Sequence, residues 1–497
     1  MEAYLGALMT VLQPSHLLII LVCSLAGIVF GAIPGLSGGL GVSLLLPLTF
    51  GMEPTLGFAM LIGMWVGGVS GSFIAATLVG IPGSPASIAT CFDAYPMSQK
   101  GETVRALSIG ILGSFTGTFF SVVIATVLSP VIADLALKLG PWEYFSLCFC
   151  AITLVASLSK GSIFKGLMGA FLGIFIATIG MDPVTAQRRF TFGSIWLSAG
   201  ISMVPLMLGV FAIKQVAVDY AKGQQDMPEV DTKGIKGIGI KIADITSNIV
   251  NIIRSFMIGL WIGFLPGMGS GLSNMVAYAQ AKSGSKKPEE FGKGCPDGIW
   301  ASEVSNNASV GGALIPMMAL GIPGDSTTAL LLSGLMIHGL QPGPLMIGAN
   351  PQVSYVIFAA TLVAAVLVLF MQLFGMRWFP YLLKVPYHYL YGIILVMCFV
   401  GGYTSSNTMF NVVMMLVFAG LSILMDMAKI PSSPFILAFI LGPKLEEYFR
   451  KGVSYGNNGI ADFVLRPVSL IFLLVAVVSV AWPYIKDMLN KKKSAAN

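Results

Sequence analysis

Long apolar stretches recur from one end of the chain to the other. Three of them are HLLIILVCSLAGIVFGAI from His16, VSYVIFAATLVAAVLVLFMQLFG from Val353 and VSLIFLLVAVVSVAWPYI from Val468. A helix needs roughly 20 apolar residues to cross a bilayer, and strands of a membrane barrel would be about ten residues long with alternating polarity. The pattern therefore predicts an all-α polytopic membrane protein with about 10–12 transmembrane helices.

Composition agrees with this pattern. Hydrophobic residues make up 56% of the 497 positions and charged residues only 10%, whereas soluble domains carry about 25% charged residues. The net charge of +6 comes without a basic stripe, so we expect the lipid bilayer and no nucleic acid as a partner. The last apolar run is followed by NKKKSAAN. Because Lys and Arg gather on the inner side of membranes, we expect a cytoplasmic C-terminus.

Pro–Gly pairs interrupt four of the apolar runs, at Pro34, Pro82, Pro266 and Pro323. Proline removes a backbone donor, and a glycine that follows it can adopt φ > 0. Non-helical backbone at membrane depth is tolerated only inside protein or beside a water-filled cavity. The sequence therefore predicts broken helices or re-entrant hairpins at these four places.

The breaks occur in two similar sets. GIVFGAIPGLSGGL (27–40) is similar to GLWIGFLPGMGSGL (259–272), GMWVGGVSGS (63–72) is paired with GIWASEVSNN (298–307), and GIPG occurs in both halves. We predict two homologous, inverted transmembrane repeats, residues 1–215 and 249–497, joined by a polar linker at 216–248.

A turn followed by a new helix offers free N–H groups and a positive dipole end, which suit a carboxylate. Released carbonyls suit a cation such as Na⁺, as in transporters built from repeats. Hydroxyl and carboxyl residues follow the GIPG breaks: Ser84, Ser87 and Thr90 after the first, and Asp325, Ser326, Thr327 and Thr328 after the second. The alternative is that the small residues serve close helix packing. For one GxxG packing is favoured, but the duplicated Pro–Gly breaks favour a site.

Two further stretches are polar. ASEVSNNASVGG (301–312) lies between apolar runs, and an ionisable residue there is a functional hypothesis. Glu303 is a candidate proton carrier, with the alternative that it is solvated near the interface. Asp93 and Lys100 lie in CFDAYPMSQKGE, which we interpret as a solvated loop.

The sequence resembles the TctA family, the large membrane subunit of tripartite tricarboxylate transporters, over essentially its whole length. The most specific stretches are GAIPGLSGGLGVSLLLPLTFGMEP, LVGIPGSPASIATCFDAYPMSQKGE, FLPGMGSG, ASEVSNNASVGGALIPMMALGIPGDSTTALLLSG and GLQPGP. The resemblance implies secondary-active, cation-coupled import of di- or tricarboxylates such as citrate across a bacterial inner membrane. It implies Na⁺ as coupling ion, no other cofactor, a periplasmic TctC-like binding protein, a small TctB-like membrane subunit and an elevator-like movement.

Carried over by motif, the resemblance places the site at the breaks. The substrate candidates are Ser37, Gly38, Gly39, Gly83, Ser84, Pro85, Ser87, Gly269, Ser270, Asn306, Asn307, Gly324, Ser326, Thr327 and Thr328. The cation candidates are Gly35, Gly267, Ser305, Asn306, Asn307 and Asp325, with Glu303 as the proton-coupling candidate.

Two other functions are weighed against this one. A stand-alone secondary transporter or channel for another organic anion would use the same breaks without a binding protein. An intramembrane aspartyl protease is suggested only by PGD at Pro323–Asp325, and it would need a second catalytic Asp within the spans. Because the sequence offers no convincing second one, we expect a chain that is not an enzyme.

Overall fold

The computed structural model describes residues 2–158, 162–182, 184–222, 235, 237–383 and 387–496. Its regular structure is helical, apart from one antiparallel pair of two-residue strands, β1 (Gly180–Met181) and β2 (Arg188–Arg189). The predicted all-α fold class is confirmed. The chain divides into two compact units, Met1–Asp134 with Met203–Gly420 (unit 1) and Leu135–Ser202 with Leu421–Asn497 (unit 2). Each unit therefore draws on both halves of the sequence.

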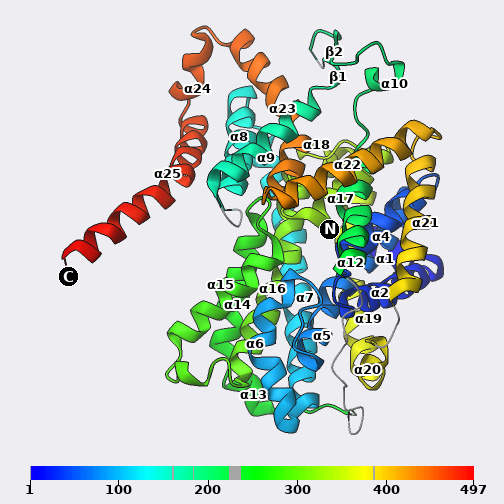
Figure 1. Ribbon diagram of the computed structural model, residues 1–497, viewed down its shortest axis with the longest axis vertical. Helices are drawn as coiled ribbons and strands as arrows, with labels where there is room; N and C mark the ends of the chain where they lie inside the picture. Colours follow the sequence, from blue (N-terminus) through cyan, green and yellow to red (C-terminus); the bar gives the residue numbers. More distant parts are fainter. Residues whose placement is uncertain are drawn as a thin grey trace. The chain divides into compact units, whose positions relative to one another are not determined.

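Figure 1 shows the order of the helices along the chain. In the first stretch of unit 1 they are α1 (Glu2–Val11), α2 (Pro14–Ala32), α3 (Gly38–Leu45), α4 (Pro54–Gly71), α5 (Phe73–Leu78), α6 (Ile88–Met97) and α7 (Thr103–Ala136). The second stretch holds α11 (Met203–Met207), α12 (Lys214–Lys222), α13 (Ile242–Thr246), α14 (Ile249–Phe264), α15 (Gly269–Gly284), α16 (Pro296–Leu320), α17 (Ser326–Ile337), α18 (Pro344–Ala349), α19 (Pro351–Gly375), α20 (Phe379–Leu382), α21 (Tyr387–Thr404) and the first part of α22 (Met409–Met427), whose end belongs to unit 2. Unit 2 contains α8 (Pro141–Leu158), α9 (Ile163–Ala177), α10 (Ile195–Ser198), α23 (Ser432–Tyr455), α24 (Asp462–Leu465) and α25 (Pro467–Ala496).

Within the described part of the chain, seven helices are long and apolar enough to cross a membrane, or up to eight if a bent pair near the C-terminus counts as one. Shorter apolar helices accompany them, including Ile249–Phe264 and Ser326–Ile337. The predicted 10–12 spans stay a prediction. A short apolar helix crosses the membrane only when it is paired with a second short helix, and these pairs are not included in the count of seven or eight. The predicted linker at 216–248 holds the end of α12 and all of α13, and 223–234 lie outside the described residues.

All four predicted helix breaks are confirmed. Helix α2 ends before Pro34 and α3 begins after it, and α14 and α15 flank Pro266 in the same way. Gly35 and Gly267 take φ +87° and +71° at these turns, as the Pro–Gly pattern predicts. At the GIPG breaks the left-handed residues are instead the glycines before proline, Gly80 (φ +71°) and Gly321 (φ +68°).

The glycines after proline in the two GIPG breaks serve close approach. A Cβ on Gly83 would lie 2.1 Å from the carbonyl oxygen of Gly31, and one on Gly324 would lie 2.6 Å from that of Gly263. Because a side chain would collide with backbone at both places, each break is pressed against the end of an earlier helix.

The helix pairs beneath these breaks pack through matching glycines. Gly31 of α2 packs on the carbonyl oxygen of Gly68 in α4, and Gly263 of α14 packs on that of Ser309 in α16. In this packing Gly68 corresponds to Ser309, whereas the sequence pairing of 63–72 with 298–307 sets it opposite Glu303. The contacts thus favour a different offset between the two halves, and the pairing of 63–72 with 298–307 stays a prediction.

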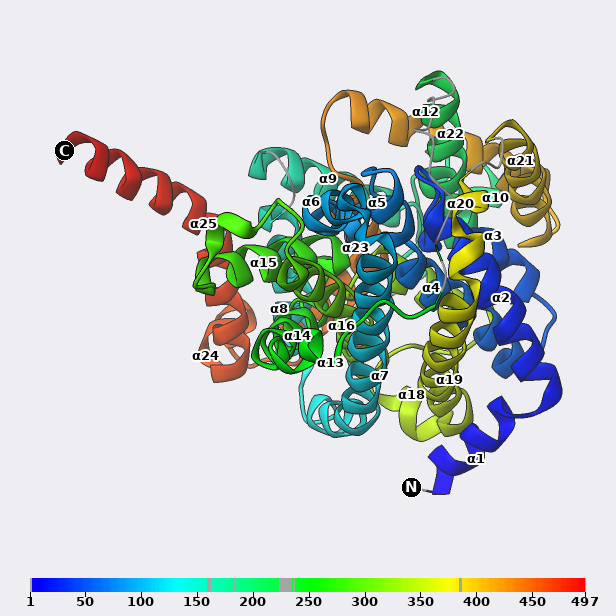
Figure 2. The same ribbon diagram turned by 90° about the horizontal axis from the view of Figure 1, so that it is seen from below.

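Helix α16 lies at the centre of the part of unit 1 that concerns function. Figure 2 shows it beside α7, α14 and α15. Glycines bring α7 and α14 to its backbone: a Cβ on Gly117 would lie 2.5 Å from the carbonyl oxygen of Val304, and one on Gly259 would lie 2.2 Å from that of Ser305. Nearly every α16 side chain is buried, so its polar residues face protein and neither lipid nor water.

Unit 2 packs α8 and α9 against α23 through small residues. A Cβ on Gly173 would lie 2.2 Å from the carbonyl oxygen of Phe435. At the β1–β2 turn, Asp182 accepts hydrogen bonds from the backbone N–H groups of Thr185 and Val184 and pairs with Arg189 and Arg450. These backbone bonds and the two guanidinium groups lower the pKa of Asp182 to about 2.

Candidate functional site

The four helix breaks meet in unit 1. An ideal Cβ on Gly39, in the first break, would lie 3.1 Å from Oγ1 of Thr327, in the last one. One on Gly271 would lie 3.3 Å from Cβ of Pro85, and one on Gly269 would lie 2.9 Å from Cβ of Asp325. The structure thus brings together candidates from both predicted repeats that are far apart in sequence.

Side chains cap the helices that start at these breaks. Ser37 Oγ accepts from the Leu40 N–H at 3.1 Å, and Ser84 Oγ accepts from the Ala86 N–H at 3.3 Å. Asp325 Oδ1 accepts from the Thr328 N–H at 2.7 Å, while the Asp325 N–H donates to Thr328 Oγ1 at 2.8 Å. These caps fix where each helix begins, because they satisfy one donor of each first turn.

The tips of the breaks are the accessible part of this site. Gly35, Pro85 and Ser326 are exposed, whereas Gly83 and Gly324 behind them are buried. The N-termini of α3, α15 and α17 point their first-turn amides and the positive ends of their dipoles into one region. Such an arrangement can hold an anionic group without a lysine or arginine side chain.

The polar residues of α16 divide into separate sets. Ser305 is bound to α15, because its Oγ donates to the carbonyl oxygen of Ser273 at 2.9 Å and its own carbonyl oxygen accepts from Ser273 Oγ at 3.3 Å. Asn306 is fully buried, and neither atom of its amide has a hydrogen-bond partner in the described part of the chain. A buried amide without partners is costly, so Asn306 is the strongest candidate among Ser305, Asn306 and Asn307 for binding substrate or ion.

Glu303 and Asn307 belong to a buried network that faces α4, α6 and α7. Glu303 Oε1 lies 2.5 Å from Thr90 Oγ1, and Glu303 Oε2 accepts from Ser114 Oγ at 3.2 Å. Asn307 Nδ2 donates to Ser114 Oγ at 3.0 Å, and Asn307 Oδ1 accepts from Ser70 Oγ at 3.0 Å. Glu303 is fully buried, so the alternative of a solvated interfacial Glu303 is wrong.

The interpretation of Asp93 as part of a solvated loop is also wrong. Asp93 lies in α6 and is fully buried. Its Oδ1 accepts from the N–H groups of Gly292, Gly294 and Cys295 at 2.8–2.9 Å, and its Oδ2 accepts from Tyr278 OH at 2.8 Å. The carboxylate is solvated by backbone amides of the α15–α16 connection, so it fixes that connection to α6.

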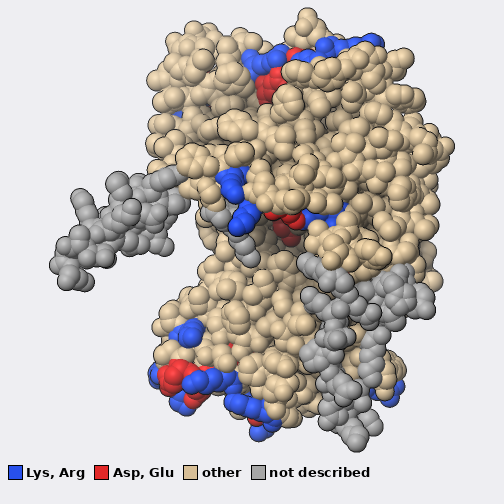
Figure 3. Space-filling view, viewed as in Figure 1, with Lys and Arg blue, Asp and Glu red and all other residues tan. Residues whose placement is uncertain are grey.

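The charged residues of this connection lie outside the site. They include Lys286, Lys287, Glu289 and Glu290, which are exposed, and Figure 3 shows charged side chains gathered at the end of unit 1 that carries α13 and α15. Lys100 is exposed as predicted, and its Nζ donates to the carbonyl oxygen of Lys293 at 2.6 Å.

Several residues that build the site were missed by sequence reasoning. Asn274 of α15 donates to the carbonyl oxygens of Pro85 and Ala86 at 3.0 and 2.8 Å, which holds the first GIPG break. The others are the network residues Ser70, Ser114, Thr118 and Gln372. They are neutral Ser, Thr, Asn and Gln residues in largely apolar helices, where such residues often serve only helix packing.

The fold and the site define an all-α polytopic membrane protein whose broken helices converge in one unit. The model of the tripartite tricarboxylate transporter TctA family matches residues 17–437. The chain is 31% identical over 483 residues to a 52.8 kDa protein of the TAR-I ttuC′ 3′ region of Agrobacterium vitis, covering 97% of this chain and 96% of that protein. A protein of the TAR-II ttuC′ 3′ region of the same organism is 29% identical over 234 residues, which cover 97% of it and 47% of this chain. The chain belongs to the TctA family of tripartite tricarboxylate transporters.

Proposed function

We propose that this chain is the translocating subunit of a secondary-active importer that takes up a di- or tricarboxylate such as citrate together with Na⁺. The substrate carboxylates bind at the converging helix N-termini. The observation that supports this is the meeting of the breaks, where Gly39 lies against Thr327 and Gly271 lies against Pro85.

The chemistry of the break tips favours a carboxylate over a cation as the main ligand. Helix N-termini present donors and partial positive charge, and the accessible hydroxyl of Ser326 adds a further donor. Asn306, with both amide atoms unpartnered, offers one donor and one acceptor to substrate or ion. Asp325 lies beside Gly269, and its negative charge would balance a cation that binds together with the anion.

Family membership supports the rest of the proposal. The chain acts in a bacterial inner membrane with a small TctB-like membrane subunit and a periplasmic TctC-like binding protein that delivers the carboxylate. We also propose that the sequence is a pair of inverted repeats, because equivalent glycines make equivalent contacts in both halves, and that an elevator-like movement carries the site across the membrane.

Uptake into proteoliposomes tests this function. The vesicles hold the chain with its small-subunit partner, and radiolabelled citrate or a smaller dicarboxylate is added with or without the binding protein, under an imposed Na⁺ or proton gradient. We expect accumulation only when the binding protein and the Na⁺ gradient are both present. Vesicles without the chain are the control.

Two results would contradict the proposal. Accumulation without the binding protein would identify a stand-alone carrier for an organic anion. Accumulation driven by the proton gradient, with no effect of Na⁺, would show that the coupling ion is a proton. Glu303 would then be the candidate proton carrier.

A further inference from the structure

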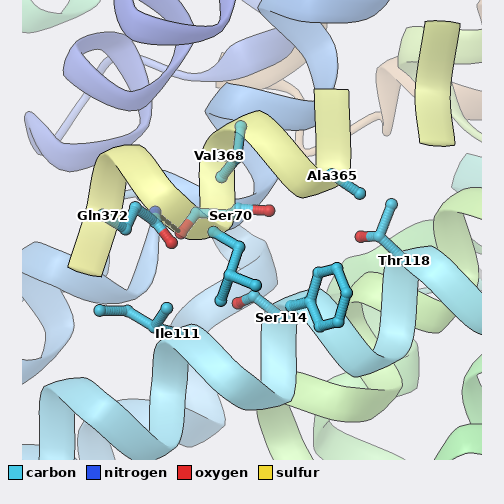
Figure 4. Close-up of a pocket in the computed structure, with 9 residues that line it drawn as sticks. Ser70, Ile111, Ser114, Thr118, Ala365, Val368 and Gln372 are labelled. Atoms are coloured by element: carbon cyan, nitrogen blue, oxygen red, sulfur yellow. Dashed lines mark hydrogen bonds between the residues drawn. The ribbon is translucent and has the colours of Figure 1, made fainter. Parts of the chain in front are cut away.

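A narrow pocket lies between α4, α7 and α19, beside the α16 network (Figure 4). Its polar lining consists of Ser70, Ser114, Thr118 and Gln372, and the rest is apolar. All four are at most 3% exposed. These residues come from three helices, so the pocket exists only because unit 1 is assembled.

One oxygen in this pocket has no partner. Gln372 is fully buried, and its Nε2 donates to the carbonyl oxygen of Ser70 at 2.8 Å. That bond fixes the side-chain amide, and Gln372 Oε1 is left without a hydrogen-bond donor among the described residues. An unsatisfied buried acceptor costs stability, so a ligand that accepts electron pairs would be held here.

The remaining polar atoms of the pocket are also oxygens. Ser70 Oγ and Thr118 Oγ1 both donate to Asn307 Oδ1, at 3.0 and 3.3 Å. Ser114 Oγ donates to Glu303 Oε2. Hydroxyl, amide and carboxylate oxygens without nitrogen or sulfur ligands are typical of hard cations.

Charge and size limit which cation fits. Glu303 is the acidic group of the network, and none of the ion pairs of the described residues involves it. An ionised carboxylate that is buried is balanced by one positive charge, so a monovalent ion matches it where a divalent ion would not. A water-sized sphere does not fit in the pocket, so a hydrated ion is excluded and a small dehydrated ion such as Na⁺ is favoured.

We propose that this pocket binds a dehydrated Na⁺ through Gln372 Oε1 and the hydroxyls of Ser70, Ser114 and Thr118, with the Glu303 carboxylate as the balancing charge. The proposal rests on the proposed function in one respect, that the ion bound here takes part in coupling. It adds a cation position to the sequence-based candidates, which lie at the breaks (Gly35, Gly267 and Asp325) and on α16 (Ser305, Asn306 and Asn307). Substrate and ion then occupy separate sites, and Asn307, whose Oδ1 accepts from Ser70 Oγ and Thr118 Oγ1, borders the ion site.

Ion binding can be measured without transport. The full chain, purified in detergent, is heated at constant ionic strength while NaCl replaces KCl or choline chloride, and the melting temperature is titrated against Na⁺. A ligand that binds only the folded state raises the melting temperature. We expect Na⁺ to raise it where K⁺ and choline do not.

Hydroxyl-to-methyl variants locate the site. Thr118→Val should weaken the apparent Na⁺ affinity about tenfold or more, as expected for one lost charge–dipole ligand, and Glu303→Gln should abolish the Na⁺ effect. Thr361→Val is the matched control, because Thr361 is a buried α19 hydroxyl that donates only to the carbonyl oxygen of Ile357. Ser70→Ala replaces Thr118→Val if that variant does not fold.

Unchanged Na⁺ affinity in Thr118→Val and Ser70→Ala would overturn the proposal. It would also fail if wild type showed no Na⁺-specific shift, for instance if stability responded only to pH and this response disappeared in Glu303→Gln, which would identify a proton site. Loss of the binding-protein requirement in uptake would contradict the tripartite function, but a Thr118-dependent Na⁺ shift would still stand.

Discussion

At the scale of single residues, Asp93 makes a sharp prediction about stability. Its Oδ1 accepts from three backbone N–H groups, and an amide nitrogen at either position would face a donor. We expect Asp93→Asn to destabilise the fold by about 2–3 kcal/mol, since hydrogen bonds to a buried charge are the strong ones. The loosened connection should also be cut faster by trypsin after Lys286, which can be followed by timed digestion and mass spectrometry.

Tyr278→Phe is the matched control for this change. It removes one hydrogen bond to Asp93 Oδ2 and keeps the ring, so we expect a loss of about 1 kcal/mol and almost normal digestion. If Asp93→Asn were cut no faster than wild type, the carboxylate would not be what holds the connection.

For Asp325 we expect a substitution that changes transport but has little effect on stability. Its Oδ1 caps α17 by accepting from the Thr328 N–H, and an asparagine oxygen can accept the same bond. We expect Asp325→Asn to change stability by less than about 1 kcal/mol and to weaken the Na⁺ dependence of uptake, because the negative charge beside Gly269 is gone. Melting curves and uptake at several Na⁺ concentrations measure the two effects, and wild-type Na⁺ dependence would rule out a role for the charge.

At the scale of elements, the GIPG breaks depend on backbone contact. A Cβ at Gly83 or Gly324 would collide with a carbonyl oxygen of α2 or α14, so we expect Gly83→Ala and Gly324→Ala to destabilise by about 1–3 kcal/mol each and to abolish uptake while the protein remains in the membrane. Gly420→Ala is the control, since a Cβ on Gly420 would meet nothing within 4 Å. Normal uptake in either break variant would show that transport does not need close contact between the break and the earlier helix.

The elements differ in how far the sequence predicts them. Proline and glycine act locally, so the breaks at Pro34, Pro82, Pro266 and Pro323 could be predicted from their neighbours alone. The partners of these breaks could not, because Gly39 and Thr327 meet only after long stretches of chain have folded. The role of Gln372 could not be predicted either, because its hydrogen-bond partner Ser70 lies on another helix. The burial of Asp93 could not be predicted because the amides that bind it lie about 200 residues further along the chain.

At the scale of the whole molecule, both units contain carboxylates whose ionised form is stabilised. The pKa of Asp182 in unit 2 is lowered to about 2 by backbone N–H groups and arginines, and the pKa of Asp244 in unit 1 is lowered by the Arg105 guanidinium. A lowered folded-state pKa contributes stability that is fully present above the ordinary value of 3.8 and is lost as the pH falls through the folded value. We expect melting temperatures to fall between about pH 4 and pH 2, less steeply in Asp182→Asn; an identical profile in that variant would contradict this assignment.

The meeting of distant breaks allows a direct test of how the two halves of the chain are joined. Because an ideal Cβ on Gly39 lies 3.1 Å from Thr327 Oγ1, cysteines at these positions match the Cβ-to-sulfur separation across a disulfide of normal geometry. We expect Gly39→Cys with Thr327→Cys to cross-link under mild oxidation, and Gly271→Cys with Pro85→Cys to do the same, since their Cβ atoms lie 3.3 Å apart. Mass spectrometry of the digested protein identifies each bridge.

A mismatched pair makes this test specific. A Cβ on Gly51 would meet nothing within 4 Å, so Gly51→Cys with Thr327→Cys should not form a bridge under the same conditions. The two expected bridges join different breaks, and each connects one half of the sequence to the other. If only one formed, the breaks would converge on one side alone, and the carboxylate site would then be built mainly from the helices of that side. If both form, breaks from the two halves lie against each other at two places, so the candidate carboxylate site is built from both halves of the chain.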